Sequence, residues 1–194
     1  MTPSATPKAR MVVGITGASG IVLAIRLLET LRRLDIESHL VMSRAAKMTL
    51  RYETDRKAAD IHALADVVHA IRDIGAPISS GSFRTLGMIV VPCSMKTLAE
   101  VATGVTGTLL SRAADVTLKE RRRLVLIPRE TPLHAMHLRN MLTVTEMGGV
   151  IAPPVPAFYN RPESLDDVVD HLVGRALDLF SLDAELMQRW GEDE

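Results

Sequence analysis

Aromatic residues and cysteine are scarce in this chain of 194 residues. Aromatic residues make up 3% of the sequence, and Cys93 is its one cysteine. A single thiol excludes a disulfide within the chain and favours a reducing compartment, so we expect a cytoplasmic protein. No run approaches the ~20 apolar residues that a membrane-spanning helix needs, and residues 1–10 lack the apolar centre of a signal peptide. We therefore expect no membrane span.

An excess of charge of either sign is also missing. The 23 lysines and arginines balance the 23 aspartates and glutamates, which gives no reason to expect binding to nucleic acid or to a membrane surface. Hydrophobic residues make up 47%, and a chain of this length forms one domain with a sizeable core. We expect a single domain over residues 11–194, preceded by a flexible tail over residues 1–10.

Short apolar runs alternate with amphipathic segments along the sequence. The pattern predicts strands at 11–16, 36–42, 67–70, 88–91, 123–127 and 150–151, and helices at 21–34, 44–51, 61–64, 96–102, 109–118, 133–147 and 165–182. Ser43 and Ser164 are predicted helix caps, and Pro92 and Pro128 are predicted to end strands. Wholly apolar strands that alternate with helices indicate an α/β fold with a parallel sheet covered on both faces.

Ligands of such folds bind at the carboxyl ends of the strands, where the first turn is rich in small residues. Gly17-Ala18-Ser19-Gly20 lies between a predicted strand and a predicted helix, so its backbone N–H groups suit a phosphate. A third glycine at dinucleotide-binding spacing is missing, which favours a single phosphate over a full dinucleotide. A purely structural turn is the alternative.

The segment Pro92–Thr97 follows another predicted strand. Ser94 and Thr97 offer hydroxyl groups, and the next helix offers free N–H groups, although the same residues also fit a simple helix cap. Cys93 has no evident partner for nucleophilic chemistry, so a buried structural thiol is the favoured interpretation.

Charged side chains flank the predicted strand 123–127. Arg129 and Glu130 follow it directly, which favours a functional pair over a surface ion pair. Arg112 fits a site or an interface ion pair equally well, and Arg175 fits a solvated helix face. The aromatic loop that holds Tyr159 is typical of a packing lid or a subunit contact.

His134 and His137 lie three residues apart on one predicted helix. Further ligands at suitable spacing are lacking, so we expect no metal site.

Seven stretches taken together resemble the UbiX-type flavin prenyltransferases. The resemblance runs from Met11 to about Trp190, and the stretches are, in order, G-I-T-G-A-S-G, H-L-V-M-S-R-A-A, S-S-G-S-F-x-T-x-G-M, P-C-S-M-K-T-L, R-A-A-D-V-T-L-K-E-R-R, P-R-E-T-P-L-H and P-P-V-P-A-F-Y-N-R-P. The resemblance implies a three-layer αβα Rossmann-like, flavodoxin-like domain. It also implies a homo-oligomer, expected to be a dodecamer, with active sites at subunit contacts.

The activity that this resemblance implies is prenyl transfer to a flavin. The dimethylallyl group of dimethylallyl phosphate joins N5 and C6 of reduced FMN without a metal, and the prenylated FMN serves a UbiD-type decarboxylase. The positions that match the family's FMN-binding residues are Gly17, Ala18, Ser19, Ser43, Ser94, Met95, Lys96, Thr97 and Arg129. Those that match its prenyl phosphate site are Ser80, Arg112, Lys119, Glu130, Tyr159 and Arg175.

Roles follow from the chemistry that the resemblance implies. Lys119 and two arginines stabilise the charge on the leaving phosphate, Glu130 gives it a proton, and Ser19 helps to relay the proton lost from the flavin ring. Glu53 matches a family acid and is expected to reach a neighbouring subunit's site. Ile74 replaces a tryptophan found in some members, which leaves the length of the prenyl donor open.

Three rival functions remain open at this point. The first is decarboxylation of cysteinyl substrates by a flavin enzyme of related fold, whose P-A-S-A-N-T and P-x-M-N-x-x-M-W motifs this chain lacks. The second is a non-catalytic FMN-binding accessory subunit of an aromatic acid decarboxylase. The third is direct decarboxylation of an aromatic acid.

Overall fold

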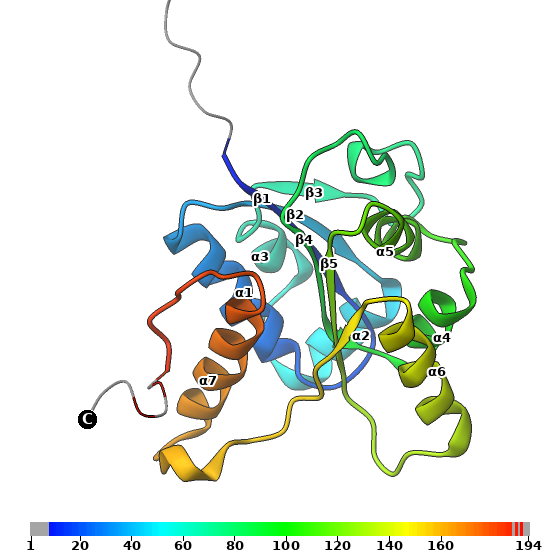
Figure 1. Ribbon diagram of the computed structural model, residues 1–194. Coiled ribbons are helices and arrows are strands. Elements are labelled where there is room, and N and C mark those ends of the chain that lie inside the picture. Colours follow the sequence, from blue (N-terminus) through cyan, green and yellow to red (C-terminus); the bar gives the residue numbers. More distant parts are fainter. Residues whose placement is uncertain (1–7, 188, 190, 192–194) are drawn as a thin grey trace, which may run out of the picture.

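A computed structural model describes residues 8–187, 189 and 191 of the chain (Figure 1). The strands are β1 (Arg10–Ile15), β2 (Glu37–Met42), β3 (Val67–His69), β4 (Gly87–Cys93), β5 (Arg123–Pro128) and β6 (Val150–Ile151). The helices are α1 (Ile21–Arg33), α2 (Arg44–Glu53), α3 (Ala58–His62), α4 (Met95–Thr103), α5 (Leu109–Lys119), α6 (Ala135–Glu146) and α7 (Leu165–Asp178). Most of the expected tail and Trp190 lie outside the described residues.

The six strands form one parallel sheet in the order β3-β2-β1-β4-β5-β6. This is the strand order of the Rossmann fold, and the direction of progression reverses between β1 and β4. The prediction of an α/β fold with a parallel sheet is therefore confirmed, as are the approximate positions of all six strands.

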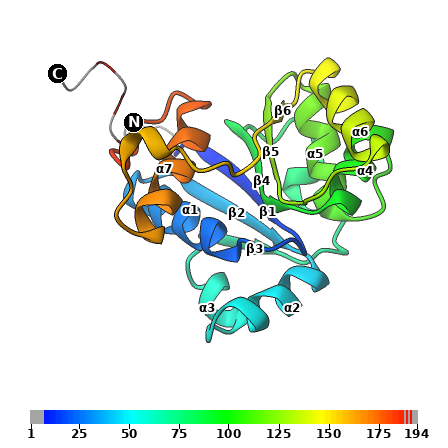
Figure 2. The same ribbon diagram turned by 90° about the horizontal axis from the view of Figure 1, so that it is seen from below.

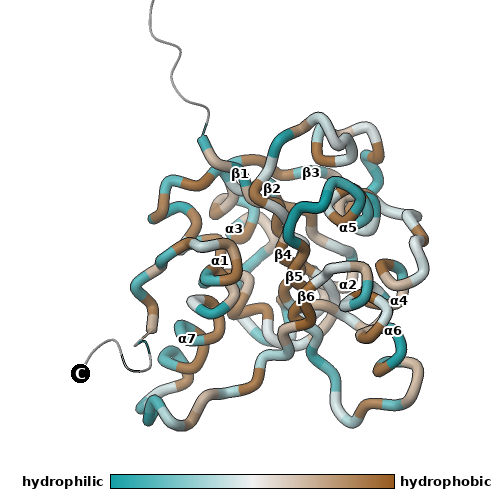
Figure 3. Tube along the Cα trace, in the orientation of Figure 1, coloured by the Kyte–Doolittle hydropathy of each residue, from teal (hydrophilic) through white to brown (hydrophobic). Residues whose placement is uncertain are grey.

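Helices cover both faces of the sheet, as Figure 2 shows from below. Alternate residues of β1 point to opposite faces, so that Met11 and Val13 pack with α1 and α7 while Val12 packs with α4 and α5. The central strands β1, β4 and β5 are mostly apolar (Figure 3). Two apolar layers thus hold the sheet between its helices. Among the described residues, no helix has the length and apolarity needed to cross a membrane.

Two of the predicted helix caps are confirmed. The Ser43 hydroxyl accepts a hydrogen bond from Ala46 N at 3.0 Å at the start of α2. The Ser164 hydroxyl accepts one from Asp167 N at 3.1 Å at the start of α7. Each side chain supplies an acceptor for an N–H group that has no partner within its helix.

The prediction that Pro92 ends its strand is wrong, because β4 continues to Cys93. The missing N–H of Pro92 is accommodated where the β4–β5 register shifts, between Val90 and Cys93. The carbonyl group of Pro92 still accepts a hydrogen bond, from Thr16 N at 3.2 Å.

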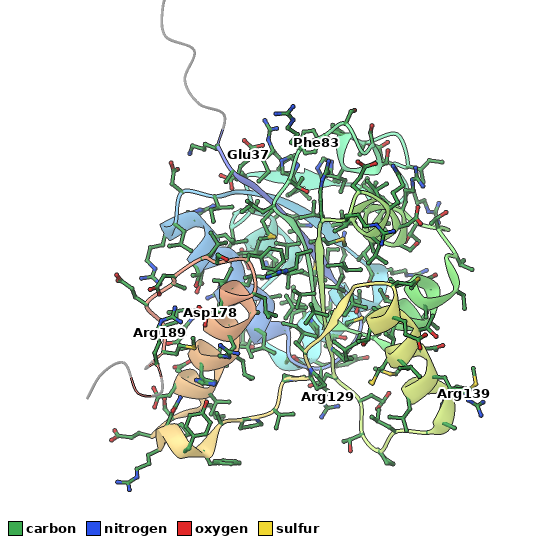
Figure 4. All side chains as sticks on the ribbon, in the orientation of Figure 1. Glu37, Phe83, Arg129, Arg139, Asp178 and Arg189 are labelled. Carbon is green, nitrogen blue, oxygen red and sulfur yellow. The ribbon has the colours of Figure 1, made fainter. Side chains whose placement is uncertain are left out.

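A chain of polar side chains lies at the amino end of the sheet, near Glu37 and Phe83 in Figure 4. His39 is 3% exposed, and its Nδ1 lies 2.9 Å from Nε2 of His69. Its other nitrogen lies 2.8 Å from Glu37 Oε1, which also accepts a hydrogen bond from Arg10 Nε. Because the carboxylate can only accept, His39 donates to Glu37 and must accept from His69 when both rings are neutral.

We predict that His69 makes the protein less stable in mild acid. Burial and the neighbouring His39 lower the pKa of His69 below its ordinary value of 6.5, although the Asp73 charge opposes this shift. The unfolded chain therefore binds more protons than the folded chain below about pH 6.5, so the free energy of unfolding falls as the pH drops through this range. Urea unfolding between pH 5 and 8 should show a shallower fall for His69→Gln. The exposed His134→Gln serves as control, and an unchanged slope in His69→Gln would contradict the prediction.

Candidate functional site

A cavity of about 480 Å³ opens at the carboxyl ends of β1, β2 and β4, next to the point where the strand order reverses. Its size lies within the usual range for small-molecule sites. The lining residues are Thr16, Gly17, Ser43, Arg44, Ala45, Met48, Ile71, Arg72, Ser94, Lys96, Thr97, Glu100, Gly107, Thr108 and Leu110. The place is the one at which open α/β sheets bind their ligands.

Thr16 joins the ends of β1 and β4 at this cavity. Its side chain is 1% exposed and donates a hydrogen bond to Pro92 O at 2.7 Å. The Thr16 hydroxyl oxygen in turn accepts a hydrogen bond from Ser94 N, also at 2.7 Å. One hydroxyl group therefore ties the end of β1 to the end of β4. The sequence analysis did not single out Thr16, because its partners lie more than 70 residues away along the chain.

The amino ends of α2 and α4 both border the cavity. Ser43 and Ser94 cap these helices, each by accepting a hydrogen bond from a backbone N–H three residues further on. Helix amino ends favour anions, and the guanidinium groups of Arg44 and Arg72 add positive charge. The Lys96 ammonium also lies here, paired with Glu100 at 2.6 Å. The cavity is therefore suited to a phosphate at one end.

The other part of the cavity wall is apolar. Met48, Ile71 and Leu110 line it, and Gly17 brings its backbone against α2. A Cβ on Gly17 would lie 2.4 Å from the Cβ of Ala45, so any side chain there would push α2 away. An apolar wall beside an anion site fits a flat organic ring with a phosphate tail.

The N–H groups at the amino end of α1, which follow the small-residue turn, have a partner within the single chain. The carboxylate of Glu53 accepts hydrogen bonds from Gly20 N and Ile21 N, at 3.0 and 2.9 Å to the same oxygen. In the single chain Glu53 binds this turn, and its expected reach to a neighbouring subunit stays a prediction. A carboxylate already occupies the place where a phosphate would lie.

The residues predicted to bind a cofactor gather at this edge of the sheet. Those that line the cavity are Gly17, Ser43, Ser94, Lys96 and Thr97. Ala18 and Met95 are next to lining residues in the chain, and Ser19 lies two residues beyond Gly17. Arg129 N donates a hydrogen bond to Cys93 O at 3.3 Å, which places Arg129 just beyond β5 (Figure 4). Glu130 follows it and is exposed, with one carboxylate oxygen accepting from Thr131 N.

Two residues predicted for the prenyl phosphate site lie at the opposite edge. Lys119 ends α5, is paired with Glu120 and lies against Gly81, next to Ser80. This is the amino end of β5, and the six residues of that strand separate it from Glu130 by roughly 20 Å. Figure 4 shows the separation, with Phe83 near the upper edge and Arg129 at the lower one. A single chain thus does not bring Lys119 and Ser80 to Glu130.

The remaining three predicted residues lie on other surfaces. Arg112 is paired with Asp115 on α5 at 2.7 Å. Arg175 on α7 is paired with Asp178 at 3.0 Å and borders a cavity of about 220 Å³ beside β6. Tyr159 is 58% exposed and makes an edge contact with the ring of His171.

Cys93 is fully buried, and burial raises the pKa of its thiol to about 12. A thiol of this kind is not a thiolate nucleophile near neutral pH. Within the described residues, no group of three histidine, cysteine or acidic side chains is placed to hold a metal ion.

Comparison with known proteins identifies the family. The model of the Flavoprotein family matches residues 2–177. The flavin prenyltransferase UbiX of Escherichia coli K12 is 58% identical over 184 residues, which cover 93% of this chain and 97% of that protein. The chain belongs to the UbiX-type flavin prenyltransferases.

Solved structures agree with this membership. The crystal structure of AnUbiX in complex with FMN and dimethylallyl pyrophosphate has a TM-score of 0.94 and 58% identity, covering 97% of this chain and 100% of that one. A dodecameric FMN-dependent UbiX-like decarboxylase from Escherichia coli O157:H7 has a TM-score of 0.91 and 54% identity, covering 93% and 98%. The fold and the sequence relationship thus extend over nearly the whole chain.

We predict that Thr16→Val weakens both the fold and ligand binding at the cavity. Valine has the shape of threonine but leaves the half-buried Ser94 N without its acceptor, which costs about 1 kcal/mol or more of the free energy of unfolding. Urea unfolding and FMN titration measure the two effects. Thr30→Val is the matched control, since Thr30 is also buried but its hydroxyl donates a hydrogen bond to Arg26 O within the same helix, α1. Equal effects of the two substitutions on FMN affinity would contradict the prediction.

Proposed function

We propose that this chain transfers the dimethylallyl group of dimethylallyl phosphate to reduced FMN, and that its product serves a UbiD-type decarboxylase. The observation that carries the proposal is the cavity where the strand order reverses, with its two helix amino ends and its apolar wall. AnUbiX, a structure of the same fold at 58% identity, is in complex with FMN and dimethylallyl pyrophosphate. We place the activity in the domain at residues 11–194 of a cytoplasmic protein.

The cavity fits FMN on two counts. The capped amino ends of α2 and α4, together with Arg44 and Lys96, suit the phosphate. The apolar wall at Met48 and Leu110 suits the isoalloxazine ring. FMN-binding roles are accordingly proposed for Gly17, Ala18, Ser19, Ser43, Ser94, Met95, Lys96, Thr97 and Arg129.

The prenyl phosphate site requires more than one copy of the chain. Lys119 and Glu130 lie at opposite edges of the sheet, roughly 20 Å apart along the six residues of β5. Contacts between copies in a homo-oligomer, which we propose to be a dodecamer like that of the related decarboxylase, join these residues into one site. The set proposed for this site is Ser80, Arg112, Lys119, Glu130, Tyr159 and Arg175.

The side chains of this site then act on the leaving phosphate. Lys119, Arg112 and Arg175 stabilise the negative charge that develops as the carbon–oxygen bond breaks. Glu130 donates a proton to the departing phosphate, and Ser19 helps to relay the proton that is released on ring closure. Reduced FMN, when bound, supplies the two atoms, N5 and C6, that take up the prenyl group.

Anaerobic incubation with reduced FMN and dimethylallyl phosphate tests the proposal. Mass spectrometry of the released flavin should show a mass increase of one five-carbon prenyl unit, and the pyrophosphate donor is tested alongside. If FMN is bound but remains unchanged with both donors, a non-catalytic FMN-binding subunit replaces the proposal.

We predict that Glu130→Gln retains FMN binding but slows prenyl transfer by about 10²-fold or more. The amide cannot give a proton to the leaving phosphate, whereas the shape of the side chain is kept. Single-turnover formation of the prenylated flavin measures the rate, and FMN titration measures binding. Glu146→Gln, an exposed acid at the end of α6, is the control. An equal loss of FMN affinity in Glu130→Gln would show that Glu130 has a structural role.

A further inference from the structure

The first turn of α1 lacks a capping side chain of its own. Gly20 is the residue before the helix, with a φ of 107°, and as a glycine it has no side chain to accept a hydrogen bond from the helix. The N–H groups of the first turn of any helix have no partner within the helix. An acceptor from elsewhere is therefore needed.

Glu53 supplies that acceptor from the far end of α2. One carboxylate oxygen accepts from both Gly20 N and Ile21 N, at 3.0 and 2.9 Å, and the second lies 3.2 Å from Gly20 N. A carboxylate at this position also interacts favourably with the positive end of the helix dipole. Glu53 thus occupies the position that a phosphate takes at the amino end of a helix.

The same helix also forms one wall of the cavity. It begins after Ser43, it contributes Ala45 and Met48 to the lining, and it ends at Glu53. Its first turn touches Gly17, and its last residue binds Gly20. The turn between β1 and α1 is consequently held by α2 at both ends, with Ser19 between the two contacts.

We infer that Glu53 is a positioning residue for the flavin site. It fills the anion position of α1, which leaves the flavin phosphate to the amino ends of α2 and α4, and it fixes the turn that carries Ser19. This inference rests on the proposed function only where it concerns FMN. The hydrogen bonds from Gly20 N and Ile21 N to Glu53 form in the protein without any ligand, so that part of the inference does not depend on FMN.

The test compares the variants Glu53→Ala and Glu53→Gln with a variant that loses a carboxylate cap of another helix. Asp167 accepts from Glu163 N and Ser164 N, at 2.8 and 3.0 Å, and so caps α7 away from the cavity. Asp167→Ala is therefore the control for the loss of a carboxylate cap. Glutamine keeps one acceptor oxygen at position 53, and so it keeps most of the effect of that cap.

We expect both alanine variants of the ligand-free protein to lose about 2–4 °C in Tm, as is usual for a lost helix cap in a chain of this size. Sodium formate, a small carboxylate, should restore the Tm of Glu53→Ala. The rise in Tm should exceed the rise caused by the same concentration of sodium chloride, and it should exceed the rise that formate causes in the wild type. The Kd for FMN should rise about fivefold in Glu53→Ala, stay within about twofold in Glu53→Gln, and remain unchanged in Asp167→Ala.

Two results would overturn the inference. If formate does not restore the Tm of Glu53→Ala, the amino end of α1 does not bind an anion in the place of the Glu53 carboxylate. If Glu53→Ala and Asp167→Ala bind FMN equally well, Glu53 only stabilises the fold. A wild type that binds no FMN would defeat the proposed function, and the formate titration of the ligand-free protein would still decide the role of Glu53.

Discussion

The hydroxyl group of Thr16 links the two strands between which the ligand cavity opens. β1 and β4 are paired neighbours in the sheet, and a backbone hydrogen bond from Thr16 N to Pro92 O continues beyond their pairing. Because the helices that follow these two strands leave the sheet on opposite faces, the strand ends also need a link between the turns beyond them. A buried side chain that both donates and accepts fixes their relative position. Ser94 and the amino end of α4 depend on that link for their place at the cavity.

Charge is divided between the two edges of the molecule. The carboxyl edge holds the helix amino ends together with Arg129 and Glu130, whereas Lys119 lies at the amino edge beside Gly81. Each of these charged groups is solvated or paired within the chain, so none is a costly buried charge. The single chain can therefore fold with these charged groups apart, and in the proposed oligomer their removal from water would strengthen their electrostatic effect.

Much of the fold and part of the site can be predicted from local sequence. The apolar runs located the strands, and the positions of Ser43 and Ser164 predicted two helix caps, because these signals involve residues at most four positions apart. The small residues after β1 also predicted the turn between β1 and α1. Neither Thr16 nor the true partner of Glu53 could be found in this way, since their hydrogen bonds join residues 78 and 33 positions apart. Pro92 misled the strand prediction because a shift in register, which sequence does not display, accommodates it.

The double attachment of α2 has a consequence for insertions and deletions. The helix has 10 residues, so Ser43 and Glu53 are held about 15 Å apart and at a fixed rotation about the helix axis. One residue added inside α2 would turn Glu53 by about 100° away from Gly20, and four would restore its direction but carry it about 6 Å too far. The length of α2 is consequently constrained more tightly than its composition, whereas the segment that follows Glu53 is free of this constraint.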